Sequence, residues 1–340
     1  MVHMRVLVTG GAGFIGSNFV RRMLAGAYAG FEDAEITVLD KLTYAGNLSS
    51  LAGVLDDPRL RFVRADICDR DAVEQAVTGA ATVVHFAAES HVDRSLLDGD
   101  AFIASNVVGS YELLRAALRA DVGRFVLVST DEVYGETDTA SWTEDFPLRP
   151  NSPYSASKAS AELIARSFHR TYGLPVCTAR ASNTYGPRQF PEKLIPLFVT
   201  NLLDGLTVPL YGDGSQVREW IHVDDHCRGI ALIAGAGRPG ESYNVGGGTE
   251  MSNVELTGLL LEFLDADWSR VRFTEDRKGH DRRYSIDCQK IREELGHRPR
   301  VAFRDGLLDT VRWYADHRDW WQPLKNRGKP VASALAAQSH

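Results

Sequence analysis

The sequence predicts an α/β fold, in which a doubly wound parallel sheet is followed by a smaller mixed α/β domain. Six short runs rich in Val and Ile are apolar almost without interruption, which is typical of parallel strands covered on both faces. Segments with helical periodicity lie between these runs. This alternation of strand and helix is the pattern from which doubly wound sheets are built.

The predicted elements follow one another in a regular order. The strands are expected at 5–9, 36–40, 61–64, 82–86, 124–130 and 176–180, and the helices between them at 14–25, 70–78, 101–120 and 154–172. Beyond residue 180 the chain is rich in Gly, Pro and Asn, and helical patterns return at 253–264, 287–295 and 304–317. We therefore expect a first domain over 1–180, a second over 181–325 with chain crossovers, and a disordered tail over 326–340.

Charge and composition exclude several classes of protein. The chain of 340 residues has a formal net charge of −7, which argues against a general nucleic-acid surface. It contains no run of about 18 apolar residues, so no membrane span is expected, and its N-terminus lacks a signal-peptide pattern. The cysteines lie far apart without metal-ligand spacing, at Cys68, Cys177, Cys227 and Cys288. We expect reduced thiols, a cytoplasmic protein and no bound metal.

A glycine-rich stretch, VTGGAGFIG, follows the first predicted strand and opens the first predicted helix. Gly10, Gly13 and Gly16 have the spacing G-x-x-G-x-x-G. In such a loop the first glycine allows the tight turn, the second lets backbone approach a pyrophosphate, and the third lets the helix pack on the strand. The helix N-terminus then faces the phosphates. The stretch therefore predicts a Rossmann-type dinucleotide site.

Acidic residues end the second predicted strand and follow the third. Asp40 could accept a hydrogen bond from a ribose 2′-hydroxyl and would repel a 2′-phosphate, which favours NAD over NADP. Lys41 weakens that inference, because a cation beside Asp40 could tolerate a phosphate. Asp66 could reach the adenine amino group, or it could cap the helix that follows.

The stretch NSPYSASKA predicts the start of a long helix. Ser152 is typical of an N-cap and Pro153 of a first helical residue, which places Tyr154 and Lys158 on one helical face. A lysine ammonium near a phenol is expected to lower the phenol pKa from about 10, so that the phenol could act as a base toward a substrate hydroxyl. Thr130, at the end of the fifth strand, could hydrogen-bond the same hydroxyl.

Two carboxylates stand side by side after the fifth strand, in VSTDEVYG. A solvated turn is the ordinary interpretation of an Asp-Glu pair, because charged residues mostly lie exposed. If Asp131 and Glu132 instead share a site, their mutual repulsion raises one pKa and leaves the other carboxyl ionised. Such a pair would supply an acid and a base at one place.

Eight stretches carry a resemblance to a known family. They are VTGGAGFIGSNFV, DKLTYAGN, FAAESHVDRS, STDEVYG, NSPYSASKA, SNTYGPRQFPEKLIP, YGDGSQVREW and DRKGHDRRYSID, and they span the chain from residue 5 to about residue 290. The chain resembles the extended short-chain dehydrogenases/reductases and, more narrowly, the dTDP-glucose 4,6-dehydratases of deoxysugar pathways. STDEVYG is the discriminating stretch, because related epimerases and decarboxylases usually lack the Asp-Glu pair after Thr.

The resemblance implies loss of water from dTDP-glucose, giving dTDP-4-keto-6-deoxyglucose, with NAD as cofactor. The implied catalytic set is Thr130, Asp131, Glu132, Tyr154 and Lys158, with Glu132 as the base at C5 and Asp131 as the acid at C6. Besides the glycine loop, Tyr154 and Lys158, the implied cofactor contacts are Phe14, Ile15, Asp40, Lys41, Leu42, Thr43, Asp66, Ile67, Ala87, Ala88, Ser105 and Thr184. The implied sugar-nucleotide contacts, mainly in the second domain, are Ser90, Thr130, Asn183, Glu192, Lys193, Pro209, Tyr211, Arg218, Asn253, Arg277 and His280.

Some positions invite a separate expectation. Thr184 stands where the family usually has a second Asn, which puts one cofactor-side hydrogen bond in question. His91 is expected to shape the loop after the fourth strand, and His222 to pack beneath Arg218, rather than to act in catalysis.

Two other functions share parts of this pattern. A nucleotide-sugar 4-epimerase or decarboxylase of the same family would use the same oxidation at C4, and a non-catalytic protein could use the fold to sense NAD. The Asp-Glu pair argues against the first, and Thr130 with Tyr154 and Lys158 argues against the second.

The resemblance also implies a homodimer. Related enzymes pair the helices that correspond to 101–120 and 154–172 across a twofold axis into a four-helix bundle. On the first of these helices a single apolar stripe is expected, formed by Phe102, Ile103, Val107, Leu114 and Leu118.

Overall fold

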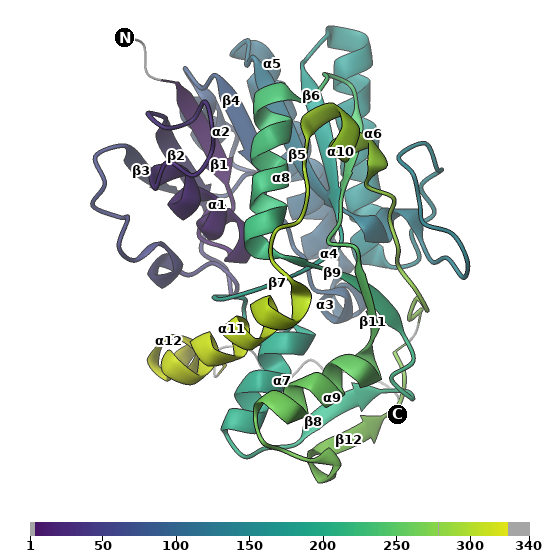
Figure 1. The fold of residues 1–340 in the computed structure, drawn as a ribbon. Helices are drawn as coiled ribbons and strands as arrows, with labels where there is room; N and C mark the ends of the chain where they lie inside the picture. Colours follow the sequence, from purple (N-terminus) through teal and green to yellow (C-terminus); the bar gives the residue numbers. More distant parts are fainter. Residues whose placement is uncertain (1–3, 278, 326–340) are drawn as a thin grey trace.

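The computed structural model describes residues 4–277 and 279–325. One large sheet with helices on both faces lies above a smaller region of short strands and helices (Figure 1). The predicted tail at 326–340 lies outside the described residues.

The large sheet has seven strands, all parallel, in the order β10-β6-β5-β4-β1-β2-β3. They are β1 (Arg5–Thr9), β2 (Glu35–Asp40), β3 (Leu60–Arg64), β4 (Thr82–His85), β5 (Arg124–Thr130), β6 (Val176–Ala181) and β10 (Ser242–Val245). From β1 the chain first adds β2 and β3 on one side of β1. It then adds β4, β5, β6 and β10 on the other side. The carboxyl ends of β1 and β4 therefore flank the switch point where doubly wound sheets bind ligands, and the predicted fold class is confirmed.

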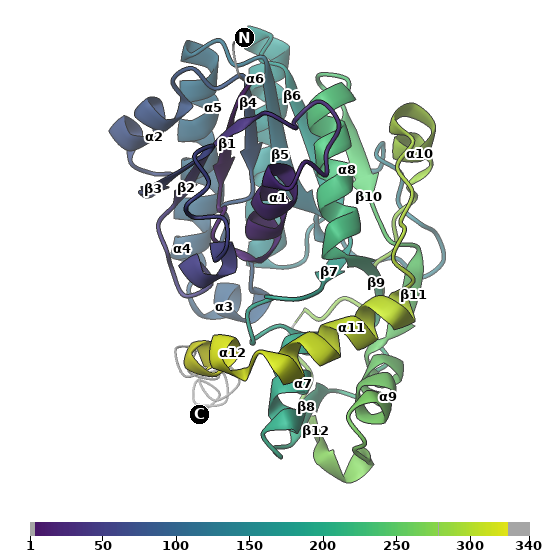
Figure 2. The same ribbon diagram turned by 60° about the vertical axis from the view of Figure 1, so that its left-hand side comes forward.

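The seventh strand comes from beyond residue 180. β10 pairs in parallel with β6, with Ser242 opposite Thr178. Helices α8 (Val223–Ala236) and α10 (Gln289–Leu295) return to this sheet with it (Figure 2). The division at residue 180 stays a prediction, with these segments as its crossovers.

Helices cover both faces of the large sheet, which explains why its strands are apolar almost throughout. On one face α1 (Phe14–Leu24) and α8 enclose a core. On the other face, α2 (Arg70–Val77), α5 (Ser110–Arg119) and α6 (Pro153–Tyr172) enclose a second core. α6 begins as expected, because Ser152 accepts from the backbone N–H of Ser155 and Pro153 is the first helical residue.

The helix expected over 101–120 is confirmed, because the chain is helical without a break from Gly99 to Arg119, but the single stripe predicted along it is wrong. A short helix, α4 (Gly99–Phe102), passes into a π-helical segment, η2 (Ile103–Gly109), before α5 begins. The wider π turn rotates the face that follows it. Phe102 and Leu114 are buried, whereas Ile103 is 52% exposed.

The smaller region is built from short elements. A three-stranded sheet has the order β11-β9-β7, and a two-stranded sheet pairs β12 with β8. These strands are β7 (Asn183–Tyr185), β8 (Val208–Tyr211), β9 (Val217–His222), β11 (Thr249–Ser252) and β12 (Val271–Thr274). The helices that complete the chain are α3 (Val92–Leu97), α7 (Leu194–Leu203), α9 (Asn253–Phe263), α11 (Phe303–Asp316) and α12 (Arg318–Lys325), with short 3₁₀ turns η1 (Leu48–Leu51), η3 (Asp131–Tyr134) and η4 (Trp268–Arg270). The five strands share one core with α7, α9, α11 and α12. This region lies below the carboxyl edge of the large sheet (Figure 2).

Candidate active site

A cleft of about 290 Å³ opens at the carboxyl edge of the large sheet. All five residues of the expected catalytic set line it. Most of the expected cofactor residues line it as well, namely Gly10, Gly13, Phe14, Ile15, Gly16, Asp40, Lys41, Thr43, Ile67, Ala87, Ala88, Ser105 and Thr184. Ser90, Asn183, Glu192 and Lys193 line the same cleft from the substrate set. The structure thus brings together residues that the sequence analysis singled out separately, from β2, β5 and β7, from α1, η2, η3 and α6, and from the loops between these elements.

The glycine loop has the geometry of a phosphate cradle. Gly10 has φ of +70°, and a Cβ there would lie 2.5 Å from the backbone nitrogen of Ala87. A Cβ on Gly16 would lie 2.3 Å from the carbonyl oxygen of Gly10, so the third glycine is needed for the close packing of α1 on the loop. The first turn of α1 carries no acidic residue, which leaves its positive end available to an anion.

The end of β2 is fixed by backbone donors. Asp40 Oδ2 accepts from the N–H of Ala12 at 3.0 Å, and Oδ1 accepts from the N–H of Leu42 at 2.8 Å. Each carboxylate oxygen retains a second lone pair for a hydroxyl donor. Leu42, which adopts φ of +58°, is not among the residues lining the cleft and instead shapes this turn.

Lys41 is engaged by Asp66 and Ser105. Its ammonium lies 3.3 Å from Asp66 Oδ2 and 3.2 Å from Ser105 Oγ. Asp66 also accepts from the N–H of Cys68, and the cap of α2 is Asp69. The alternative that Asp66 caps the following helix is therefore wrong, because the chain makes one more turn before α2 begins.

Tyr154 and Lys158 face the cleft from the first turns of α6, and both are buried. Lys158 Nζ donates to the carbonyl oxygen of Val128 at 2.6 Å. Burial lowers the pKa of Lys158 to about 8, although the Glu162 carboxylate opposes this shift. The expected lowering of the phenol pKa is not observed. Burial, and then the Glu132 and Asp131 carboxylates, raise the pKa of Tyr154, while a hydrogen bond with Thr130 opposes this rise.

The adjacent carboxylates after β5 are not a solvated turn. Asp131 is only 2% exposed and Glu132 is partly buried, and both line the cleft within η3. Thr130 Oγ1 donates to Asp131 Oδ1 at 3.3 Å and accepts from the N–H of Glu132 at 3.3 Å. Asp131 Oδ2 is buried without a hydrogen-bond partner among the described residues, so this oxygen remains available to a substrate.

The two carboxyls differ in their surroundings. Burial, and then the carboxylates of Glu132 and Glu219, raise the pKa of Asp131 well above its usual value. Burial also raises the pKa of Glu132, but the cations of Lys193, Arg277 and Arg218 oppose that rise. Asp131 is therefore the partner that holds a proton more readily, and Glu132 the partner that ionises first.

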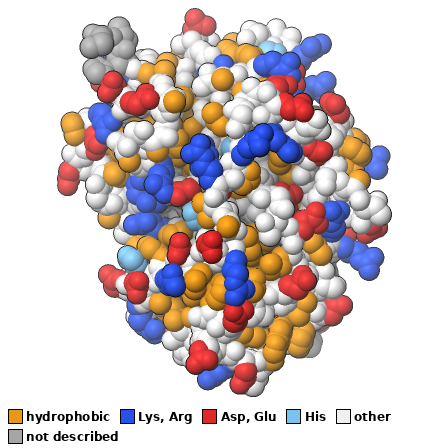
Figure 3. All heavy atoms as spheres, in the orientation of Figure 1, with side chains coloured by type: hydrophobic (Ala, Val, Ile, Leu, Met, Phe, Trp, Pro, Cys, Tyr) orange, Lys and Arg blue, Asp and Glu red, His pale blue; other side chains and the backbone are white. Residues whose placement is uncertain are grey.

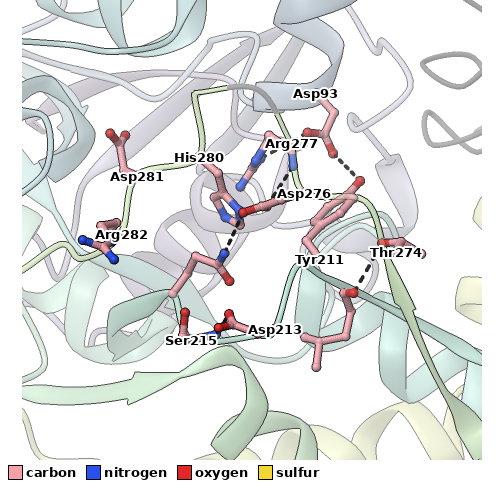
Figure 4. Close-up of polar contacts among 12 residues, drawn as sticks. Asp93, Tyr211, Asp213, Ser215, Thr274, Asp276, Arg277, His280, Asp281 and Arg282 are labelled. Atoms are coloured by element: carbon pink, nitrogen blue, oxygen red, sulfur yellow. Dashed lines mark hydrogen bonds and ion pairs between the residues drawn. The ribbon is translucent and has the colours of Figure 1, made fainter. Parts of the chain in front are cut away.

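The outer part of the site lies in the smaller region, where Figure 4 shows a network of charged and polar side chains. Asp93, in the first turn of α3, accepts from Tyr211 Oη at 3.3 Å and from Arg277 Nη1 at 3.2 Å. His280 Nδ1 lies 2.6 Å from Asp276 Oδ1. Burial, and then the Arg277 charge, lower the pKa of His280 to about 4, so this imidazole is neutral near pH 7.

The remaining expected substrate residues lie around this network. Arg218 is 5% exposed, donates to the carbonyl oxygens of Val217 and Asp281, and stacks on the Tyr284 ring. It is thus buried rather than a surface residue. Asn253 is buried at the start of α9, and Pro209 lies on β8 next to Tyr211.

A family model described as GDP-mannose 4,6 dehydratase matches residues 7–310. The chain belongs to this family. The dTDP-glucose 4,6-dehydratase of Actinoplanes sp. is 59% identical to it over 319 residues, which are 94% of this chain and 100% of that protein. The crystal structure of DesIV, a dTDP-glucose 4,6-dehydratase from Streptomyces venezuelae solved with NAD bound, is 62% identical with a TM-score of 0.94 and covers 94% of this chain and 100% of its own. The resemblance seen in the sequence motifs is confirmed.

Another branch of related enzymes shares the fold at lower identity. The structure of UDP-glucose 4-epimerase from Thermotoga maritima, solved with UDP-glucose, is 32% identical with a TM-score of 0.84, and covers 92% of this chain and 99% of its own. The backbone fold is therefore common to dehydratases and epimerases, and the side chains of the cleft must distinguish them.

Sequence reasoning missed several residues in and around this dehydratase-family cleft. Arg94 donates twice to Glu192 Oε2, at 2.9 and 2.7 Å, and its guanidinium lies 3.9 Å from the centre of the Tyr44 ring. Asp93 fixes the outer network, and Gln189 lines the cleft beside Thr184. Asp93 and Arg94 occur in the FAAESHVDRS motif, and their place just after a predicted strand was the signal that could have found them.

Separate expectations were given for Thr184, His91 and His222, and the structure shows where each of them lies. Thr184 Oγ1 lies 2.8 Å from His226 Nδ1, so its hydroxyl is held by α8 at the edge of the cleft. His91 lies at the start of α3 with Nε2 3.2 Å from the carbonyl oxygen of Glu192. The expectation for His222 is wrong, because its ring packs against Tyr185 and its Nδ1 accepts from the N–H of Asp224.

Two features are absent from the described residues, 4–277 and 279–325. No cluster of His, Cys, Asp and Glu in them could hold a metal ion. No helix in them is long and apolar enough to cross a membrane.

Proposed function

We propose that this protein converts dTDP-glucose to dTDP-4-keto-6-deoxyglucose, by oxidation at C4, removal of water across C5 and C6, and reduction at C6. One observation carries the proposal. Asp131, which is buried, and Glu132, which is partly buried, share the cleft with Thr130, Tyr154 and Lys158. Oxidation alone needs only the last three, and elimination of water needs an acid and a base in addition.

The residues of the cofactor end fit NAD. The turn at Gly10 and the start of α1 would hold the pyrophosphate, and Asp40 would accept from the adenosine ribose. Because Lys41 is engaged by Asp66 and Ser105, it does not offer a free cation to a 2′-phosphate, which supports NAD over NADP. When bound, NAD supplies the acceptor for the hydride of C4 and the donor that reduces C6.

The proton of the sugar 4-hydroxyl is taken by Tyr154, with Thr130 orienting that hydroxyl. To accept this proton Tyr154 reacts as the phenolate, and burial and the two carboxylates, which raise its pKa, make that phenolate a strong base. The charge of Lys158, fixed against the Val128 carbonyl, stabilises the phenolate as it forms. The base is therefore strong, and it works in a closed, preorganised site.

Elimination follows once C4 is a ketone, since the ketone makes the C5 proton acidic. Glu132, the carboxyl surrounded by cations, removes that proton. Asp131, which holds its proton more tightly, protonates the C6 hydroxyl as it leaves as water. The neighbours of the two side chains thus assign one role to each, although the pair titrates as a coupled unit.

The smaller region supplies the residues that would bind the nucleotide part of the substrate. Arg218 and Arg277 carry guanidinium groups that can bind a diphosphate through paired hydrogen bonds. Tyr211 and Asn253 lie beside them and would contact the nucleoside. We accordingly assign cofactor binding and catalysis to residues 1–180 and most substrate binding to residues 181–325.

A homodimer is part of the proposal, formed through a four-helix bundle of η2–α5 and α6 with their copies. Large apolar side chains are exposed on these helices, with Ile103 at 52%, Val108 at 46%, Tyr111 at 43% and Leu163 at 56%. Apolar groups gathered in this way mark interaction surfaces. Light scattering should give twice the chain mass at micromolar concentration, and Leu163→Glu should yield a monomer.

The cytoplasm is the proposed compartment. All four cysteines are free, which is the ordinary state of thiols in that compartment.

Product analysis tests the proposed function. Purified protein supplied with dTDP-glucose should form a product that is lighter by one water and carries a methyl group at C6. A 4-epimerase would give a product of unchanged mass, a decarboxylase would act on a uronic acid, and an NAD sensor would give no product. Any of these three results would contradict the proposal.

A further inference from the structure

A second cavity, of about 320 Å³, lies where α1, the start of α8, the loop after β7 and α11 meet. It shares no lining residue with the catalytic cleft. Basic side chains gather over α1 on this face of the molecule (Figure 3). The residues that give the cavity its character are Asn18, Arg21, Arg22, Arg188, Asp224 and Trp313.

Within the part of the chain that the structure describes, only one of the three arginines in the cavity has a carboxylate partner. Asp224 is the single acidic residue lining it, and both oxygens of Asp224 are taken by Arg22, with Asn18 as a further donor. Arg21 donates to the amide oxygen of Asn18 at 3.0 Å, and its Nε is buried without a partner among the described residues.

Arg188 is the second uncompensated cation. It makes no hydrogen bond or ion pair within the described residues, and its guanidinium lies 5.3 Å from the centre of the Trp313 ring. Burial, and then the charge of Arg188, lower the pKa of Arg21 to about 10. Two cations therefore repel each other at the wall of a cavity whose one carboxylate, Asp224, is bonded to Arg22 and only partly offsets the charge of Arg21. This arrangement favours a bound anion.

The geometry points to a phosphate-binding site in this cavity, and we propose that it takes inorganic phosphate or a small phosphate monoester. A dianion would balance the two charges of Arg21 and Arg188, and the planar guanidinium groups match phosphate oxygens bidentately. The proposed catalytic reaction leaves this cavity without a role, so the site is an addition to that function.

The position of Arg188 ties the site to the catalytic cleft. The residue adopts φ of +68°, and the next two residues, Gln189 and Phe190, line the cleft. Tyr314 on α11 donates to the carbonyl oxygen of Gln189 at 2.5 Å. An anion between Arg21 and Arg188 would hold this loop against α1, so its binding should stabilise the folded protein.

Calorimetric titration with sodium phosphate tests the site directly. The holoenzyme is saturated with dTDP, so that the diphosphate site of the cleft is filled, and ionic strength is held constant with sodium chloride. One phosphate per chain should bind, and Arg188→Gln should weaken binding by at least about tenfold. Arg312→Gln, an exposed change of equal charge on α11, should weaken it less than about twofold. Absence of saturable binding, or equal weakening by both variants, would overturn the proposal.

Thermal unfolding guards against a variant that merely fails to fold. In chloride buffer Arg188→Gln should unfold at the same temperature as the wild type or higher, because a repulsion is removed. Phosphate should raise the unfolding temperature of the wild type but not that of Arg188→Gln. A destabilised variant together with no phosphate effect on the wild type would show that Arg188 serves the fold alone.

Discussion

The inner and outer halves of the site use charge differently. In the inner half, Asp131 and Glu132 stand together, and Asp131 Oδ2 is buried without a partner among the described residues. In the outer half, each acid has a basic or hydroxyl partner, as Asp93 has with Arg277 and Tyr211 (Figure 4). Unpaired buried charge is costly and shifts pKa values, whereas paired charge near solvent contributes little strain.

This difference indicates a division of labour. In the inner half, burial and the repulsion between the two carboxylates keep one carboxyl protonated while the other is ionised. Elimination requires this combination of an acid and a base. The outer half pairs its carboxylates with donors and offers preformed cations to a diphosphate. Changes in the inner half should therefore alter reaction rate, and changes in the outer half should alter affinity.

Removing one inner carboxyl carries the largest expected effect. Asp131→Asn and Glu132→Gln should each slow water loss by about 10²–10⁴-fold, since a general acid or base is lost. Bound NAD should still become reduced, because oxidation at C4 does not need the pair. The absorbance of the reduced nicotinamide and the yield of C6-methyl product measure the two steps separately. Asp145→Asn, on an exposed loop, is the control, and near-normal dehydration in both variants would refute the assignment.

Removing an outer cation should have a smaller effect of another kind. Arg277→Gln should raise KM for dTDP-glucose by about 10–100-fold, the loss expected for charge-assisted hydrogen bonds, with little change in kcat. Because Arg277 also lowers the pKa of Glu132, the acidic limb of the pH–rate profile should move to higher pH. Steady-state kinetics over a pH series measures both. Arg282→Gln, at an exposed residue nearby, is the control. A fall in kcat of Arg277→Gln at unchanged KM would contradict the proposed difference between the inner and outer halves of the site.

The comparison also predicts that replacing the buried Asp131 carboxyl by an amide makes the folded protein slightly more stable than the wild type. The folded-state pKa of Asp131 is raised, so its burial costs stability above that pKa, and the cost disappears as pH falls below the unfolded value of about 4. Asp131→Asn should therefore unfold a few degrees higher than the wild type at pH 8, with the gap closing toward pH 4. Asp93→Asn, which breaks the outer pairs, should unfold lower. Calorimetric scans that show Asp131→Asn destabilised at every pH would contradict this account.

Local patterns in the sequence predict the parts of the molecule that depend on neighbouring residues. The glycine loop, the cap at Ser152 and the common face of Tyr154 and Lys158 follow from spacing along the chain, and the structure has all three. The strands follow from composition. These elements were predictable because each is determined within one strand or one turn.

Features that depend on distant residues were not predictable in this way. Asp93 and Arg277, which form an ion pair, are 184 positions apart, and nothing in either neighbourhood indicates the other. The pKa of Tyr154 is governed by burial under elements that the sequence does not place, so its expected direction was wrong. The π turn at η2 depends on the packing of α4 and α5, and it escaped a pattern that assumes 3.6 residues per turn.

The path of the hydrogen atoms tests the central claim, that one site oxidises C4, eliminates water and reduces C6 of the same sugar. Substrate deuterated at C4 is mixed with an unlabelled, mass-tagged substrate and turned over in ordinary water. The account predicts deuterium in the C6 methyl of the same molecule, with none on the tagged sugar, while unlabelled substrate in heavy water should gain deuterium at C5. Deuterium returned to C4, or shared between the two sugars, would contradict it.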